Sequence, residues 1–100
     1  MVKHIVVWKL KETAEGGAAA ENAQKIKTLL EDLQTTIPEI REIEVGLNYN
    51  PTDAAYDVVL YSVFDDKAAL DRYQVHPAHQ AAASFVRHVT SARVVADYER

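Results

Sequence analysis

The residues best suited to chemistry lie together in one short segment, Asp71–Gln80. It contains Tyr73 and two of the four histidines, His76 and His79, with Pro77 between them. A histidine ring titrates near neutral pH and can take up or release a proton. A tyrosine hydroxyl can donate a hydrogen bond to a developing negative charge. This combination of residues is typical of general acid–base chemistry.

The proline is predicted to divide this segment between two helices. A proline disfavours helix at the preceding residue and favours a helix that starts at the proline itself. We therefore expect one helix to end near Tyr73 and a second to begin at Pro77, with His76 close to its cap. The break would place the tyrosine and the second histidine on different helices that meet at this point.

His79 is predicted to point toward the protein core. In the helix after the proline it shares one stripe with apolar residues three, seven and ten positions later, namely Ala82, Val86 and Val89. The apolar stripe of a helix faces the core. In the alternative interpretation, His79 and His76 only pack against the core or cap the helix.

The N-terminal segment Val2–Lys11 is predicted to be a strand that carries a further histidine, His4. Its valines, isoleucine and tryptophan fit a pleated surface. Alternation along the strand places one set of side chains on the same face: His4, Val6, Trp8 and Leu10. We assign this face to the helices. The rings of His4 and His79 are therefore expected to lie close together across the gap between helices and sheet.

The periodicity of the whole chain predicts a single α+β domain over residues 1–100. The order is β-α-β-β-α-β, with the second helix broken at His76-Pro77. This is the ferredoxin-like order, in which both helices pack on one face of one four-stranded, mostly antiparallel sheet. After the first strand and a connection at residues 12–17, the expected elements are a helix at Ala18–Thr35, strands at Glu39–Asn48 and Tyr56–Phe64, helices at Lys67–Tyr73 and Ala78–Thr90, and a strand at Ala92–Tyr98.

The composition argues against several classes of protein. The chain has a net charge of −4, whereas nucleic-acid binding calls for a basic surface. It has no cysteine, which excludes disulfides, a thiol nucleophile and a zinc site built on cysteine. The apolar run at the N-terminus is too short to span a bilayer and lacks a signal-peptide cleavage pattern. We therefore expect a cytoplasmic protein that binds neither nucleic acid nor a membrane.

Two of the strands are predicted to be apolar on both faces. The face away from the helices carries Ile5, Val7, Val59, Tyr61 and Val63. At roughly 25 cal/mol per Å² of apolar surface, leaving this patch in water costs several kcal/mol, and such patches mark interfaces. We therefore predict a homodimer in which two copies pack sheet to sheet. In the alternative, long side chains such as those of Lys9 and Arg93 cover the patch of a monomer.

Short motifs along nearly the full length of the chain resemble the stress-responsive A/B barrel domain family, the dimeric α+β barrel group. They are Val2-Lys3-His4-Ile5-Val6 at the start, Ile37-Pro38 before the second strand, Gly46 late in that strand, Tyr56 at the start of the third, His76-Pro77-Ala78-His79, and the closing Asp97-Tyr98. The resemblance implies a ferredoxin-like monomer that forms a dimer through its sheet.

The acid–base residues are similar to those of a plant polyketide cyclase of this family. That enzyme closes a linear polyketide by an aldol condensation without a metal or a cofactor. The resemblance implies that Tyr73 and His79 are a catalytic pair. It also implies that His4 is a further histidine of the pocket.

The resemblance to the cyclase does not extend to its substrate pocket. Positions that are aromatic in the cyclase correspond to Lys27 and Leu30 in this chain, and a pocket histidine corresponds to Val58. We expect substrate contacts from His76, Trp8, Leu30 and Val58. The bound compound is expected to be a small apolar carbonyl or aromatic molecule that differs from the substrate of the cyclase.

Three kinds of function are compared on this basis. The first is a cofactor-free enzyme, cyclase-like, lyase-like or monooxygenase-like, in which His79 is the base, Tyr73 the oxyanion donor and His4 an orienting group or relay. The second is a non-catalytic, stress-related binding or structural homodimer with a filled pocket. The third is a metal site at His4, His76 and His79, since imidazoles suit zinc, copper or nickel. Histidines on either side of a proline do not obviously converge, so we predict neither a metal nor a cofactor.

Overall fold

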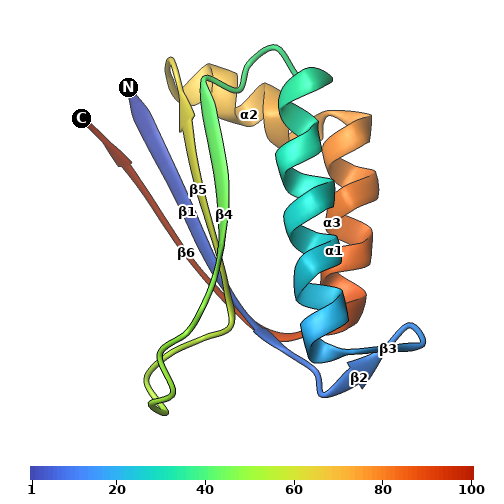
Figure 1. Ribbon diagram of the computed structural model, residues 1–100. Coiled ribbons are helices and arrows are strands. Elements are labelled where there is room, and N and C mark those ends of the chain that lie inside the picture. Colours follow the sequence, from blue (N-terminus) through green and yellow to red (C-terminus); the bar gives the residue numbers. More distant parts are fainter.

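The computed structural model describes residues 1–100 and has two layers, a four-stranded sheet and helices that pack on one of its faces (Figure 1). The elements are β1 (Val2–Leu10), β2 (Thr13–Ala14), β3 (Gly17–Ala18), α1 (Ala19–Asp32), the 3₁₀ turn η1 (Leu33–Thr35), β4 (Glu42–Leu47), β5 (Val58–Phe64), α2 (Lys67–Val75), α3 (Pro77–Val89) and β6 (Thr90–Glu99). The predicted ferredoxin-like α+β fold is confirmed, as is the break between the two helices that follow β5.

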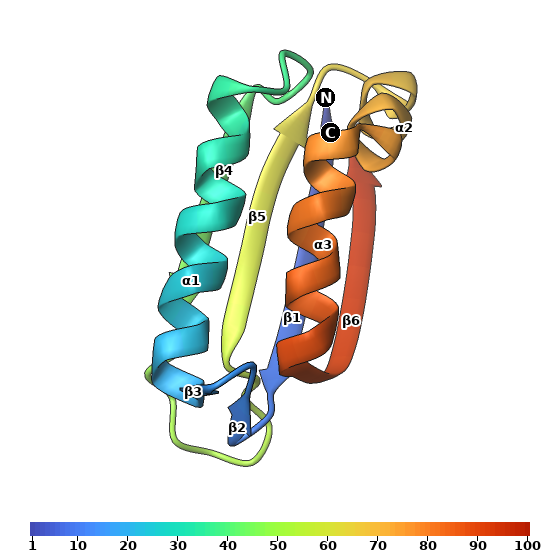
Figure 2. The ribbon, with the colours of Figure 1, turned by 90° about the vertical axis from the view of Figure 1, so that its right-hand side faces the viewer.

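Strand β1 lies inside the sheet, whose order is β4-β5-β1-β6 with every neighbouring pair antiparallel. Buried residues occupy every second position of β1 from Val2 to Trp8, which confirms that this set faces the helices. The register pairs His4 with Ser62 of β5 on one side and with Asp97 of β6 on the other. Figure 2 shows α1 and α3 side by side over the sheet, with β6 at the edge beyond α3.

The apolar core fills the space between the helices and the sheet. Helix α1 contributes Ile26 and Leu30, both of which are buried. Helix α3 contributes the predicted stripe, whose members Ala82, Val86 and Val89 are buried. Burial of this stripe sets the rotation of α3 about its axis. It therefore directs His79, in the first turn of the helix, toward the sheet. None of the helices is long and apolar enough to cross a membrane.

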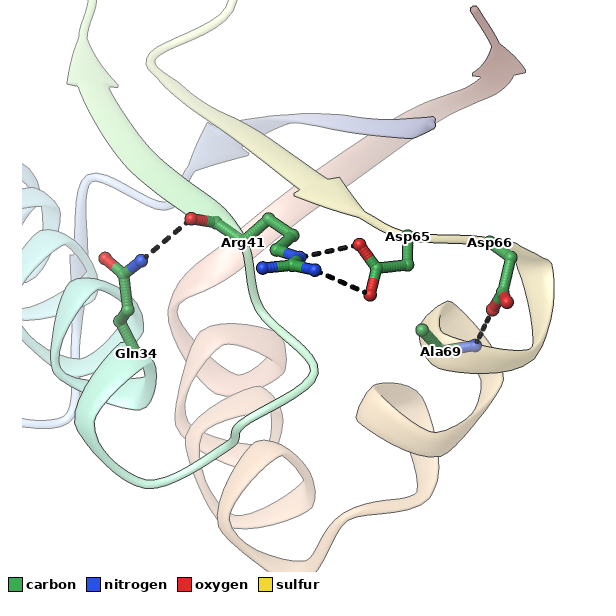
Figure 3. A network of polar contacts seen from close by, with 5 residues as sticks. All are labelled: Gln34, Arg41, Asp65, Asp66 and Ala69. Carbon is green, nitrogen blue, oxygen red and sulfur yellow. Dashed lines mark hydrogen bonds and ion pairs between the residues drawn. The ribbon is translucent and has the colours of Figure 1, made fainter.

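Polar contacts hold the start of α2 (Figure 3). The guanidinium of Arg41, just before β4, donates to both carboxylate oxygens of Asp65, at 2.6 and 3.1 Å. The next residue, Asp66, accepts a hydrogen bond of 2.8 Å from the backbone N–H of Ala69 and so caps the helix. Together these contacts fix the entry into the helix that carries Tyr73.

The connection between β1 and α1 corrects the sequence prediction. It is a small hairpin of β2 and β3, where only a connection was expected. Its two turn residues, Glu15 and Gly16, have φ of 50° and 75°. Positive φ at both positions is what a type I′ turn requires, and glutamate adopts it rarely, so the sequence signal was weak. The predicted helix Ala18–Thr35 also ends earlier, at Asp32, and continues as η1.

The opposite face of the sheet carries no helix (Figure 1). Four of the five apolar residues predicted there are partly exposed and Val63 is buried. The amine of Lys9 lies over the ring of Tyr56, 5.6 Å from its centroid. Arg93 was expected to help cover this patch, but it lies on the helix face, because it is the register partner of Trp8.

Candidate active site

The helix break brings Tyr73 and His79 together. Helix α2 ends at Val75, and His76 then adopts an extended conformation with φ of −64° and ψ of 134°. Its Nδ1 accepts a hydrogen bond of 3.0 Å from the backbone N–H of Ala78 and so caps α3, as the proline predicted. With the chain bent at this point, the rings of Tyr73 and His79 have centroids 4.4 Å apart and planes inclined by 52°.

His4 approaches the same pair from the sheet. The residue is only 2% exposed. Its ring centroid lies 6.3 Å from that of Tyr73 and 6.4 Å from that of Phe64. His4 and His79 both contact the cavity described next, so the two rings are on the same side of the sheet. The predicted faces of β1 and α3 therefore agree with the structure, in which the ring of Tyr73 lies near both histidines.

A cavity of about 260 Å³ lies between the helices and the sheet around these three rings. It is at the small end of ligand sites, which suits a small molecule. Its apolar lining comes from Val6, Trp8, Leu30, Leu60, Ala83 and Val86. Its polar lining comes from His4, Tyr73, Gln74, His79, Arg87 and Arg93.

The hydroxyl of Tyr73 is buried and has no hydrogen-bond partner in the protein. Burial raises the pKa of Tyr73 to about 12, because the charged phenolate is disfavoured away from water. The group is therefore protonated at neutral pH and can act only as a hydrogen-bond donor or a neutral acceptor. An orphaned hydroxyl beside a cavity is ready to bind an oxygen of a ligand.

The pKa of His79 is shifted in the opposite direction to that of Tyr73. Burial lowers its pKa below the ordinary 6.5; a hydrogen bond with the carbonyl of Gln74 acts against this, and His4, Arg87 and Arg93 lower the pKa further. The ring is therefore neutral at pH 7. Its Nδ1 lies 3.1 Å from the carbonyl oxygen of Gln74, which can only accept, so Nδ1 carries the proton. The lone pair of the ring is left on Nε2, where it can accept a proton.

Asp97 is part of the site although the sequence analysis assigned it no role. Its carboxylate contacts Nδ1 of His4. A carboxylate only accepts, so Nδ1 of His4 carries the proton, and Nε2 of a neutral His4 ring holds the lone pair. The side chain of Asp97 is 43% exposed, whereas His4 is enclosed. Asp97 therefore connects a buried imidazole to the solvent side of β6.

The predicted site residues fall into two groups. His4, Trp8, Leu30, Tyr73 and His79 all line the cavity. The other two predicted substrate contacts, Val58 and His76, are not part of its lining. Val58 shares the face of Trp8 but is enclosed by the core, with 1% exposure. His76 is occupied by its capping role.

Three polar residues of the cavity were not predicted as site residues from the sequence. Gln74 supplies the carbonyl that orients His79, and Arg87 and Arg93 supply positive charge at the cavity. Arg87 is exposed, but it also contributes to the lining of the cavity. No three side chains among the histidines and carboxylates are gathered in a way that could hold a metal ion.

Comparison with known proteins decides the family. The sequence profile of the stress-responsive A/B barrel domain matches residues 2–100. The chain belongs to the stress-responsive A/B barrel domain family. A relative from Streptomyces coelicolor, described as uncharacterized protein SCO4036, is 33% identical over 101 residues, which cover 99% of both chains.

Solved structures extend the comparison of this A/B barrel domain. A protein from Bacteroides fragilis, described as dimeric, of unknown function and of ferredoxin-like fold, is 36% identical with a TM-score of 0.85, over 99% of this chain and 95% of that one. A hydroxynitrile lyase from Passiflora edulis has a TM-score of 0.83 at 21% identity, over 97% of this chain and 90% of that one. The likeness to the lyase shows the fold alone.

The chemistry open to this A/B barrel domain follows from its three rings. A neutral imidazole with a free Nε2 can abstract a proton, and a protonated phenol beside it can stabilise an oxyanion. The apolar part of the lining lowers the local dielectric constant, which strengthens both effects. The second imidazole, tied to a carboxylate, can hold or pass on a proton.

Proposed function

We propose that this A/B barrel domain protein is a cofactor-free enzyme that performs acid–base chemistry on a small, largely apolar carbonyl or aromatic compound. The observation that carries the proposal is the pair of Tyr73 and His79 in one cavity, with ring centroids 4.4 Å apart. In the proposed step, Nε2 of His79 removes a proton from the carbon beside a carbonyl. The electrons of the broken C–H bond form an enolate, whose oxygen accepts a hydrogen bond from the hydroxyl of Tyr73.

The two pKa directions support this division of roles. Burial alone raises the pKa of Tyr73 to about 12, which keeps it a donor. Burial is the largest cause that lowers the pKa of His79, which keeps it a neutral base. The pKa of Tyr73 is raised and that of its neighbour His79 is lowered. Adjacent groups with pKa values shifted in opposite directions are typical of an acid–base site.

His4 is proposed to act as an orienting group or proton relay. Its Nδ1 is committed to Asp97, so its Nε2 is the nitrogen available to the cavity. An enolate formed in the cavity needs a proton to return to neutral products, and a buried imidazole backed by a partly exposed carboxylate is suited to deliver one. This assigns Asp97 a positioning role: it acts through His4 and does not line the cavity.

The proposed reaction class is cyclase-like or lyase-like carbon chemistry. An enolate generated beside Tyr73 can attack a second carbonyl of the same molecule, which forms a carbon–carbon bond, and the reverse sequence breaks one. Both directions need one base and one oxyanion donor, and the chain supplies these from its own side chains. We propose that no metal or cofactor takes part. Trp8 and Leu30 are proposed to contact the apolar part of the substrate.

We also propose that the protein works as a homodimer in the cytoplasm. The helix-free face of the sheet carries partly exposed apolar side chains on its central strands, which a second copy would cover. The relative from Bacteroides fragilis is described as dimeric. Packing of two such faces gives an isologous contact, since each copy offers the same patch.

Binding of acetophenone, a small aromatic ketone, tests the proposed ligand class. Titration into the wild type should shift the ring NMR signals of Tyr73 and His79. Ala83 lines the cavity from α3, so Ala83→Phe should fill it and abolish the shifts. Ala81→Phe is the matched control, because Ala81 is exposed on the same helix. Absence of shifts in the wild type, or equal shifts in both variants, would favour a non-catalytic, stress-related dimer with a filled pocket.

A further inference from the structure

Two arginines at the cavity have no partner within the protein. Arg87 lies on α3 and Arg93 on β6, and both line the cavity. Neither guanidinium takes part in any of the ion pairs or side-chain hydrogen bonds. Two other arginines of the chain behave differently, since Arg41 pairs with Asp65 and Arg72 with Glu39. The guanidinium of Arg100 also has no partner, but Arg100 does not line the cavity, so Arg87 and Arg93 are the unpaired arginines at this site.

These two arginines place positive charge at the outer end of the cavity. Both residues are exposed, whereas Val6, Leu60 and Val86 of the same lining are buried. Strand β6 runs along the edge of the sheet beyond α3, and the helices leave it open to solvent (Figure 2). The mouth of the cavity is therefore flanked by one guanidinium from the helix and one from the strand.

The inner end of the cavity supplies a second, independent indication of a ligand. The hydroxyl of Tyr73 is fully buried and has no hydrogen-bond partner, and Tyr73 is one of the residues that line the cavity. Buried polar groups are normally satisfied, so an oxygen of a bound molecule is the natural partner for this one. The cavity therefore offers a single donor inside and a pair of cations at its mouth. The cavity has a volume of about 260 Å³, and part of its lining is apolar.

We propose that the ligand is a small apolar molecule with a carboxylate at one end, which Arg87 and Arg93 bind at the mouth while the apolar part lies inside against Tyr73 and His79. This inference rests on the proposed function, because it names the substrate class of the same cavity. A guanidinium presents a fork of N–H donors that matches the two oxygens of a carboxylate. Anchoring the charged end outside fixes which end of the molecule reaches the base.

The acidic side chain on the same face of β6 as Arg93 is already bound to another residue. Asp97 lies on β6 on the same face as Arg93, but its carboxylate is bound to His4. The arginines are therefore free to attract an anion from solution. Positive charge at the mouth of a low-dielectric cavity also raises the local concentration of anionic ligands.

Two probes of nearly equal shape test the proposal: 3-phenylpropanoate, which is anionic, and 3-phenylpropanamide, which is neutral. Calorimetric titration of the wild type should give at least about tenfold tighter binding of the carboxylate, since hydrogen bonds to charged groups are the stronger ones. Arg87→Gln and Arg93→Gln should each remove most of this preference, because they weaken binding of the carboxylate more than binding of the amide. Arg100→Gln is the matched control, because Arg100 is exposed, carries the same charge and does not line the cavity.

The remaining outcomes separate this inference from the proposed function. Ala83→Phe should abolish binding of both probes; carboxylate binding that persists in it would place the anion on the surface and overturn the proposal. Equal affinity of the wild type for both probes would also overturn it, while the proposed acid–base function would stand. Binding of neither probe would overturn it too. The proposed function fails by a different result, namely proton transfer that does not depend on His79 and Tyr73.

Discussion

His4 and Asp97 are register partners between β1 and β6, and Nδ1 of His4 contacts a carboxylate oxygen of Asp97. The two residues are far apart in the sequence and meet only because the last strand pairs with the first. The contact ties a histidine that is 2% exposed to a carboxylate that is 43% exposed. It places Nδ1 of His4 against Asp97 and leaves Nε2 as the nitrogen that is free of this contact.

Asp97→Asn should loosen this arrangement. The amide can still accept a hydrogen bond, but a neutral acceptor is weaker than a charged one, so we expect the free energy of unfolding to fall by roughly 1 kcal/mol. Nitrogen NMR should show that His4 no longer holds its proton on Nδ1 alone. Glu99→Gln is the matched control, because Glu99 lies on the same strand and forms an exposed ion pair with Lys67. Equal effects of the two variants would contradict the positioning role of Asp97.

His79 should make the stability of the protein depend on pH in a defined direction. Its pKa in the folded protein is lowered from 6.5, mainly by burial, so protonation favours the unfolded chain. The stability that His79 contributes is complete above pH 6.5 and is lost as the pH falls through its folded pKa. Urea denaturation of the wild type and of His79→Gln below pH 6.5 should show a shallower loss in the variant. Parallel curves would contradict the neutral, buried ring.

Tyr73→Phe should separate stability from activity. The hydroxyl is buried without a partner, and removal of an unsatisfied polar group relieves its desolvation. We expect the free energy of unfolding to stay the same or to rise by about 1 kcal/mol. The same change should remove the oxyanion donor and with it the catalysis. A loss of stability of about 1 kcal/mol or more in urea denaturation would show that the hydroxyl has a partner after all.

The wild type should sediment at twice the chain mass at micromolar concentration. The interface between the two copies should bury at least about 1,000 Å² of surface in total. Val94 lies on the helix-free face as the register partner of Val7, and it is 51% exposed, so Val94→Glu should leave the monomer folded. A carboxylate buried in the interface should weaken dimerisation by at least about tenfold. Val75→Glu is the control, because Val75 is 67% exposed on α2. A wild type that sediments as a monomer would contradict the dimer.

The sequence alone predicts the direction of the proposed catalytic side chains, because that direction is a local property of one strand or one helix. Alternation along β1 placed His4 and Trp8 on the helix face, and the stripe of α3 placed His79 inward. Pro77 marked the break that brings Tyr73 beside His79. Each of these inferences needs only the geometry of one strand or one helix.

The residues that β6 contributes to the candidate site could not be predicted from local geometry. Whether Asp97 and Arg93 face the helices depends on the register between β1 and β6, and a shift of one residue reverses the face of every side chain on a strand. The two consecutive residues at its centre, Val94 and Val95, are both apolar. The strand therefore shows no alternation of apolar and polar residues that would indicate which face is buried. The predicted substrate contact of Val58 was wrong for another reason. Its face of the strand was predicted correctly, but the core encloses its side chain away from the cavity.

Exchange of the methyl protons of acetophenone for deuterium in D₂O, followed by NMR, tests the roles of His79 and Tyr73 most directly. The wild type should accelerate the exchange, because enolate formation is the proposed step. His79→Gln and Tyr73→Phe should each slow the catalysed exchange by roughly 10²–10⁴-fold, the contribution of a positioned acid–base group. His88→Gln, which replaces an exposed histidine on α3 outside the cavity, should leave the rate unchanged. No acceleration by the wild type, or equal rates in all three variants, would contradict an acid–base site in this cavity.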